Sequence, residues 1–323
     1  MELYNATEKE EFLQTIELEE VRALYRYLFS KSRGAEQLYQ KDLYSFSLKQ
    51  IEDVMRNVNP ATMNSAANTK SRINHYITWA IRNGRRTNNI NPIQGTSREW
   101  EKKFIDKNVK RHFTDMELYD LVEKLYNAQD QALIQCIFEG IMGQGFSELI
   151  SMRERKINWK NNIVTVYDSK TKKEREVKVS DRCMRYIENA LKQTVYLSED
   201  TEVEKELISY KDYVFKNTKW RSSKFDRVSK SNLTKRLYII KEVYELDEFT
   251  AITISESGRI KMASELAKER GKLTKEEFAL IGDKFNLPKI KVREYEYYDI
   301  SKMKYYINNE NLKKLYEIET DIR

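Results

Sequence analysis

Apolar side chains recur every three or four positions along most of the chain, which is the spacing of amphipathic α-helices. Three such segments precede residue 90, at residues 21–28, 51–55 and 68–83. Ser47 stands just before the second segment, where a hydroxyl can accept a hydrogen bond from the first turn of a helix. The pattern therefore predicts a small helical bundle at the start of the chain.

The same spacing continues after residue 113, with Thr114 and Ser147 as predicted helix caps. Further helices are predicted at residues 133–141, 183–192, 232–244, 259–269, 275–284 and 303–318. Two runs rich in β-branched residues, 163–167 and 176–179, flank a polar turn and predict strands. We therefore expect a mainly α-helical fold that contains a small β-sheet.

A polar stretch at residues 88–95 contains Pro92, one of only three prolines, and predicts the end of a helix and the start of a linker. We place a helical domain at residues 1–95, a basic linker at 96–112 and a second domain at 113–323. The length of 323 residues agrees with two domains, because single hydrophobic cores rarely grow larger.

The charge favours a polyanionic partner. Lys and Arg number 58 against 51 Asp and Glu, a formal net charge of +7. The basic residues concentrate near turns and helix starts, in clusters such as 107–111, 170–175 and 219–230. No apolar run approaches the roughly 20 residues of a membrane span, and the first residues lack the pattern of a secretion signal. We expect no membrane partner and a cytoplasmic, nucleoid-associated location.

The sequence gives no support for a metal or a cofactor. Its only histidines, His75 and His112, are far apart, and Cys136 and Cys183 belong to no ligand cluster. We expect both cysteines to be small buried apolar residues.

The order of helical bundle, basic linker, helices, β-hairpin and helices resembles the tyrosine recombinases, or phage integrases, over about the whole chain. The segment NTKSRINHYITWA at residues 68–80 looks like the core-binding helix of that family, and Asn91-Pro92 looks like its exit. The resemblance implies a core-binding domain whose helix faces DNA through Lys70, Arg72 and Asn74. It also implies that the second domain is of the catalytic type.

Three motifs in the second domain correspond to the positions of the family's two catalytic arginines and its catalytic lysine. GQGFSELISM at residues 143–152 is similar to the family box Gly-Leu-Arg-Ile-Ser-Glu-Leu, which puts Gly145 in the place of a catalytic arginine. KTKKER at 170–175 looks like the hairpin that presents a catalytic lysine, here Lys170. RIKMAS at 259–264 resembles the helix that carries the second arginine, here Arg259.

The remaining catalytic positions are altered. Glu256 stands where the histidine of His-x-x-Arg is expected, and Asp283 replaces a histidine in LIGD at residues 280–283. The nucleophile is uncertain among Tyr295, Tyr297 and Tyr298. In the family, cationic groups stabilise negative charge on the phosphate in the transition state, and removing one such contact typically lowers the rate about a hundredfold or more. We therefore expect no catalytic residues and no enzyme activity.

DNA contacts do not require that chemistry. Lys and Arg side chains can bind phosphates, and polar helix residues can read bases in the major groove. The DNA-binding residues that we predict, besides those of the core-binding helix, are Lys170, Lys172, Arg175, Ser231, Asn232, Lys235, Arg236 and Arg259.

These observations favour a sequence-specific DNA-binding repressor on a catalytically inactive recombinase scaffold. Within the family, the altered boxes are most similar to repressors that maintain lysogeny in SPβ-type prophages. One alternative is a divergent integrase that uses Lys170, Arg259 and a tyrosine near Tyr295, and another is an accessory protein that bends or bridges DNA. The predicted C-terminal helix either packs in its own domain or joins a second copy on DNA, since its apolar pattern fits both.

Overall fold

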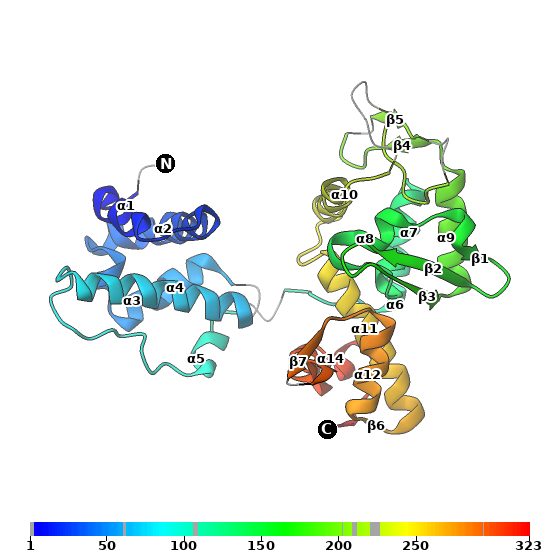
Figure 1. Ribbon diagram of the computed structural model, residues 1–323. Helices are drawn as coiled ribbons and strands as arrows, with labels where there is room; N and C mark the ends of the chain where they lie inside the picture. Colours follow the sequence, from blue (N-terminus) through cyan, green and yellow to red (C-terminus); the bar gives the residue numbers. More distant parts are fainter. Residues whose placement is uncertain are drawn as a thin grey trace. The chain divides into compact units, whose positions relative to one another are not determined.

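The computed structural model describes residues 3–60, 63–105, 109–201, 203–208, 212–219, 227–292 and 294–323. Lys107, Arg221 and Lys224, which belong to the predicted basic clusters, lie outside these ranges. The chain divides into two compact units, Met1–Val109 and Lys110–Arg323. Figure 1 shows the helices and strands of each unit. No helix within the described ranges is long and apolar enough to cross a membrane.

The first unit is a helical bundle. Its helices are α1 (Ala6–Gln14), α2 (Glu19–Tyr39), α3 (Leu48–Val58), α4 (Met63–Arg82) and α5 (Arg98–Lys102). The three predicted helices correspond to α2, α3 and α4, although α4 begins five residues earlier than expected. Ser47 caps α3 as predicted, because its hydroxyl accepts the backbone N–H of Gln50 while the Gln50 side chain accepts that of Ser47.

The first unit extends beyond the expected boundary at residue 95. Trp100 and Phe104, which we had assigned to the linker, are buried in its core. The Trp100 indole also donates a hydrogen bond to Glu52 on α3, at 2.9 Å. These contacts attach the α5 segment to the bundle, whereas the chain from Lys110 onward belongs to the second unit.

The second unit begins with helices around a small sheet. Its helices are α6 (Asp115–Val122), α7 (Ala128–Phe138), α8 (Ser147–Ser151), α9 (Asp181–Lys192), α10 (Lys230–Val243), α11 (Ala251–Arg270), α12 (Lys275–Lys284), α13 (Ile300–Met303) and α14 (Asn309–Tyr316). The antiparallel sheet consists of β1 (Ile157–Asn158), β2 (Ile163–Asp168) and β3 (Lys173–Lys178), in that order. The predicted hairpin is therefore confirmed, with one further short strand.

The described residues of the second unit form two apolar cores, and α11 contributes to both. Ile254, near its start, packs with α7, α9, α10 and the sheet, whereas Ile260 and Ala263 pack with α12 and α14. Gly258 lies between these positions, where α11 packs closely against α7. Figure 1 shows α11 passing between the two groups of elements. Residues at the middle of α11 therefore face both halves of the unit.

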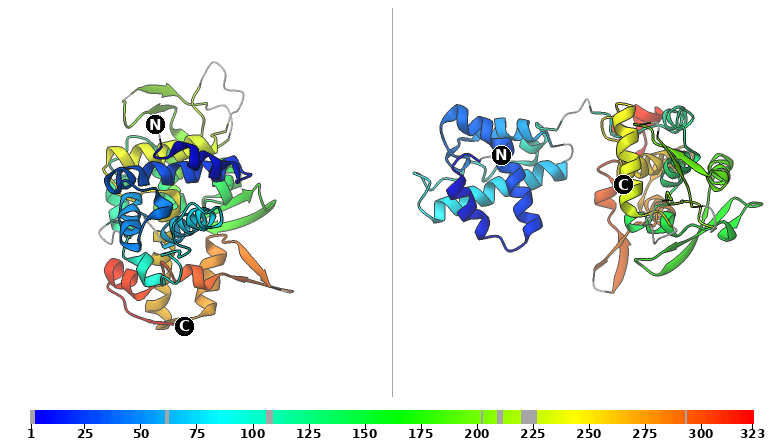
Figure 2. Two further views of the ribbon diagram at one scale, coloured as in Figure 1. Left: turned by 90° about the vertical axis from the view of Figure 1, so that its left-hand side faces the viewer. Right: turned by 90° about the horizontal axis from the view of Figure 1, so that it is seen from above.

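Among its described residues the second unit has three further short two-stranded sheets, none of which the sequence pattern predicted. They pair β4 (Val195–Leu197) with β5 (Glu204–Glu206), β6 (Lys272–Leu273) with β9 (Asp321–Ile322), and β7 (Lys289–Val292) with β8 (Tyr295–Tyr298). The β7–β8 hairpin projects from the unit in both views of Figure 2. Charged and apolar or aromatic side chains alternate at residues 289–292 and again at 294–297, which is the period of a strand.

The predicted helix at residues 303–318 is wrong. α13 ends at Met303 and α14 begins at Asn309, because the Asn308 side chain caps α14 by accepting the backbone N–H of Asn311 at 2.9 Å. Leu312 of α14 is fully buried in the core shared with α11 and α12. The sequence left open whether the C-terminal helix packs in its own domain or joins a second copy, and α14 packs in its own unit.

Ser147 does not cap α8 as predicted, because it is the first residue of that helix. The residue before it, Phe146, has a left-handed backbone, and its side chain makes no capping hydrogen bond. The Ser147 hydroxyl instead donates to Asp168 at the end of β2, at 2.6 Å. This bond joins the turn before α8 to the sheet.

Candidate nucleic-acid interface

The turn before α8 carries Gly145, the residue in the place of the family's catalytic arginine. Gly143, Gly145 and Phe146 all have positive φ angles, of 69°, 66° and 65°. A Cβ atom added to Gly145 would lie 3.5 Å from Cδ and 3.9 Å from Nζ of Lys230. The ammonium group of Lys230, the first residue of α10, therefore lies beside the position that lacks a side chain.

Arg175 does not offer a free guanidinium to DNA, contrary to our expectation. Its Nε and Nη2 donate to the two carboxylate oxygens of Glu148 at 2.7 and 2.9 Å, and the Glu148 side chain is fully buried. The same guanidinium donates to the backbone oxygens of Lys284 and Gly140. Arg175 thus connects β3, α8 and the end of α12, and this bidentate pairing accounts for its donors.

Lys170 and Lys172 lie in the turn between β2 and β3, and both side chains are exposed. The Lys170 backbone N–H donates to Asp168 at 2.8 Å, and Lys172 has a left-handed backbone with φ of 57°. Among the described residues, no carboxylate lies within ion-pair distance of either ammonium group. Both lysines are thus placed to bind an external anion.

Arg259 is buried but has no acidic partner within the described part of the chain. It is 8% exposed, and its guanidinium donates to the Tyr306 hydroxyl at 2.9 Å and to the Ser255 hydroxyl at 2.8 Å. The rings of Phe285 and Tyr306 flank it, and its buried Nε has no hydrogen-bond partner there. The pKa of the Tyr306 phenol is raised, because the effect of burial exceeds the opposing effect of the neighbouring arginine charge. A buried cation held by neutral groups is suited to an anionic ligand.

Glu256, which stands in the place of a catalytic histidine, is paired with His112. Nε2 of His112 lies 3.0 Å from a carboxylate oxygen of Glu256, and both side chains are mostly buried. The next residue, Phe113, donates its backbone N–H to Ser257 at 3.0 Å, so this segment is fixed on α11 at two points. Sequence reasoning missed this pair, because nothing local connects His112 with α11.

Asp283 is also engaged, with a tyrosine of the β7–β8 hairpin. The Tyr298 hydroxyl donates a hydrogen bond to the Asp283 carboxylate. Burial is the main reason why the pKa of the Tyr298 phenol is raised, and this hydrogen bond raises it further. The Lys289 ammonium group lies 3.7 Å from the same carboxylate. Tyr295 is 75% exposed and Tyr297 is also exposed, and among the described residues neither forms a hydrogen bond or a cation–π contact with Arg259. The tyrosine that contacts Arg259 is Tyr306, which is not among the three tyrosines considered from the sequence.

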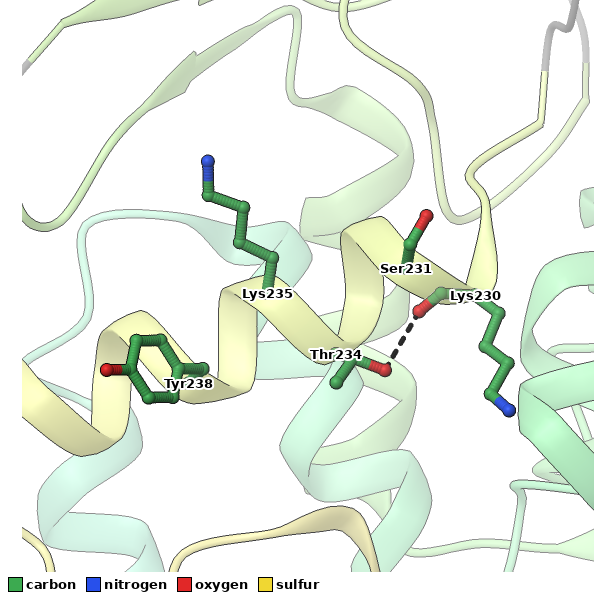
Figure 3. A pocket seen from close by; sticks show the side chains of 5 residues that line it. All are labelled: Lys230, Ser231, Thr234, Lys235 and Tyr238. Carbon is green, nitrogen blue, oxygen red and sulfur yellow. Dashed lines mark hydrogen bonds between the residues drawn. The ribbon is translucent and has the colours of Figure 1, made fainter. Parts of the chain in front are cut away.

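The outer face of α10 is polar and basic. Lys230, Ser231, Thr234, Lys235 and Tyr238 line one surface depression, as Figure 3 shows. The helix is capped by Ser229, whose hydroxyl accepts the backbone N–H of Asn232 at 3.2 Å. The Asn232 side chain is exposed and donates to Asn217 at 3.1 Å. No acidic residue is among those that line the depression.

Arg236, by contrast, lies on the inner face of α10 and is not available to read bases. It is 6% exposed and contacts the Tyr196 ring, with its guanidinium carbon 4.4 Å from the ring centroid. Its Nη1 lies 3.7 Å from the buried carboxylate of Asp130, and its Nη2 donates to the backbone oxygen of Lys216. Our expectation of a base contact here is wrong, because Arg236 falls on the apolar stripe of the helix.

The predicted contacts on α4 are partly occupied within the first unit. Lys70 forms an ion pair with Glu101 at 2.8 Å, and the Asn74 side chain accepts a hydrogen bond from Asn91 at 2.9 Å. Arg72 is half-buried on the same helix. DNA contacts from Lys70 and Asn74 would therefore compete with these internal bonds.

Comparison with known proteins identifies the family. Residues 3–82 match the family described as MrpR, N-terminal core-binding domain, and residues 112–317 match MrpR, C-terminal catalytic domain. The chain belongs to the MrpR family. The SPbeta prophage-derived uncharacterized protein YopR of Bacillus subtilis (strain 168) is 31% identical over 329 residues, which cover 99% of this chain and 99% of YopR.

Solved structures bear on the fold of this MrpR-family chain. A lambda integrase dimer bound to a COC' core site matches with a TM-score of 0.50 and 11% identity, over 94% of this chain and 76% of that chain. The Tn1549 transposon integrase in complex with a circular intermediate DNA has a TM-score of 0.49 and 10% identity, over 93% of each chain. The family match and the first structure confirm the predicted tyrosine-recombinase fold, with core-binding and catalytic-type domains.

Proposed function

We propose that this MrpR-family chain is a sequence-specific DNA-binding repressor on a recombinase scaffold that no longer cleaves DNA. The observation that carries the loss of cleavage is the pairing of Glu256 on α11 with His112, which precedes α6, at 3.0 Å. A carboxylate at this position disfavours the negative charge that develops on phosphate during strand cleavage. Gly145 removes a second stabilising charge.

DNA binding is supported by the cations that the described contacts leave without an acidic partner. Lys170 and Lys172 are exposed on the β2–β3 turn, and Lys230 begins the polar face of α10. These groups can hold phosphates, which fix the position of a protein on DNA. Ser231 and Asn232, near the start of α10, are exposed polar groups suited to base edges.

The regulatory role rests on the relative from a prophage. YopR derives from the SPbeta prophage, and the alignment covers nearly all of both chains. The lambda integrase of the matching structure binds its core site as a dimer. We propose that the present chain binds double-stranded DNA at operator sites in a prophage and maintains lysogeny there.

A divergent integrase is the second candidate, because Lys170 and Arg259 remain at catalytic positions. The geometry gives Tyr295 less support as its nucleophile, since that residue is 75% exposed, whereas the tyrosine hydroxyl next to Arg259 is that of Tyr306. The third candidate, an accessory protein that bends DNA, would share the same phosphate contacts.

One experiment separates the three candidates. The purified chain is used to protect fragments of its source genome from nuclease digestion, and the protected sites are placed upstream of a reporter gene. A repressor protects repeated sites near promoters and lowers reporter transcription. Protection confined to a single attachment site would favour the integrase, and protected sites that leave transcription unchanged would favour the architectural protein.

A further inference from the structure

Lys230 is the exposed cation nearest to the altered arginine position. It is the first residue of α10 and follows the cap Ser229. Figure 3 shows its side chain directed away from that of Lys235, which lies farther along the same helix. Within the described ranges, no carboxylate lies at ion-pair distance from the Lys230 ammonium group.

The Lys230 side chain also takes up space beside Gly145. A Cβ atom on Gly145 would meet Cδ of Lys230 at 3.5 Å, Cε at 3.8 Å and Nζ at 3.9 Å. The first atom of any side chain at position 145 would thus touch the lysine along its length. These are ordinary van der Waals distances, so the Lys230 side chain packs alongside position 145 and brings its ammonium group next to it.

The backbone at this point favours the glycine. With φ of +66°, Gly145 has a left-handed conformation that residues with a Cβ atom adopt less readily. An arginine is therefore disfavoured here by the backbone conformation, while the Lys230 ammonium group lies beside the same position. The two features are consistent with a charge that has moved from one segment of the chain to another.

We propose that Lys230 supplies the positive charge that position 145 lacks, so that the turn before α8 still binds one phosphate of a DNA duplex. The ammonium group would contact a nonbridging phosphate oxygen from the start of α10 and thereby fix the position of the polar helix face on the DNA. A lysine binds phosphate as a point charge, without the two-pronged geometry of arginine. This inference rests on the proposed DNA-binding function and names a residue for it.

The test uses a DNA duplex that the full chain protects in the experiment above. A series of duplexes is made, each with one phosphate replaced by an uncharged methylphosphonate, and the affinity of each is measured for the wild-type protein and for Lys230→Ala. Lys235→Ala is the matched control, because it removes an exposed lysine from the same helix and the same surface depression. Circular dichroism checks that the variants are folded.

At one phosphate, we expect the replacement to lower wild-type affinity about tenfold or more, as for loss of a charge-assisted hydrogen bond. At that same phosphate, the replacement should lower the DNA affinity of Lys230→Ala by less than about twofold, because this variant already lacks the contact. For Lys235→Ala and for Lys230→Arg, replacing that phosphate should lower the affinity as much as it does for the wild-type protein.

A Lys230→Ala profile identical to the wild-type profile at every phosphate would overturn the inference while leaving DNA binding intact. If Lys235→Ala also abolishes the response at that phosphate, the contact is a diffuse effect of charge and the inference is wrong. Failure of the wild-type chain to bind any duplex would overturn both this inference and the proposed function.

Discussion

Arg175 and Glu148 form a bidentate ion pair in which Nε lies 2.7 Å from one carboxylate oxygen and Nη2 lies 2.9 Å from the other. The Glu148 side chain is fully buried, and its carboxylate also accepts hydrogen bonds from the backbone N–H of Met142 and the side chain of Asn286. The pair joins the box that resembles the first recombinase motif to the β-hairpin. It therefore has a structural role in the second unit.

Arg175→Ala should destabilise the protein by about 3–5 kcal/mol, because it leaves a buried carboxylate without its cation. Urea unfolding followed by circular dichroism measures the change. Lys172→Ala, in the exposed turn of the same hairpin, is the control and should change stability by less than about 0.5 kcal/mol. Weakened DNA binding with unchanged stability in Arg175→Ala would contradict the structural role.

Gly258→Ala should destabilise the contact between α11 and α7 by about 1–3 kcal/mol or more. An added Cβ atom would lie 1.8 Å from the backbone oxygen of Phe138, which cannot move away without shifting its helix. Gly34→Ala is the control, since an added Cβ atom in α2 has no neighbour within 4 Å. There we expect stabilisation of about 0.5–1 kcal/mol from helix propensity. Thermal unfolding of both variants measures the two changes in stability. Equal changes for Gly258→Ala and Gly34→Ala would refute the prediction.

Glu277 makes stability depend on pH in the acidic range. The Thr274 hydroxyl and backbone N–H donate to its carboxylate, as does Arg270, and together they lower the pKa of Glu277 to about 2. A depressed folded-state pKa stabilises the protein above the ordinary pKa near 4.5, and this contribution is lost as the pH falls toward 2. The stability advantage of wild type over Glu277→Gln should therefore shrink between pH 5 and about 2. An advantage that stays constant over this range in denaturant unfolding would exclude the effect.

Lys170 and Asn232 should affect DNA binding differently. Lys170→Ala should weaken specific and nonspecific binding alike, and should lower the magnitude of the logarithmic salt slope by about one. Asn232→Ala should weaken the preferred site by about 1–3 kcal/mol and spare nonspecific DNA, provided that α10 reads bases. Titrations at several salt concentrations on both kinds of DNA measure this. Identical salt slopes for Lys170→Ala and wild type would remove Lys170 from the phosphate contacts.

Local signals in the sequence were sufficient for much of the fold. Thr114 caps α6 in the reciprocal arrangement with Glu117 that its spacing suggests, and the apolar periods located the long helices. Arg236 could also have been placed correctly, because it shares a helix face with Leu233, Leu237 and Ile240, all of which are buried. The position of Arg236 on that face, and not its charge, determines its surroundings.

The site could not be predicted to the same extent, because its contacts join distant segments. No local pattern brings His112 to Glu256, or Lys230 to Gly145, since each pair depends on how separate helices pack. The sequence indicated which catalytic positions were altered. It did not indicate that Glu256 and Asp283 would each bind a neighbouring side chain, His112 and Tyr298.

The central claim is that this chain binds DNA without cleaving it, and nicked suicide DNA tests it most directly. The protected site is prepared with a nick next to each candidate phosphate in turn, so that a cleaved strand end diffuses away and any tyrosine adduct accumulates. An active tyrosine recombinase on its own site serves as the positive control. With Gly145, Glu256 and Asp283 at catalytic positions, we predict a bound complex and no covalent adduct on denaturing gels. A DNA adduct on Tyr306, Tyr295 or any other tyrosine would contradict the account.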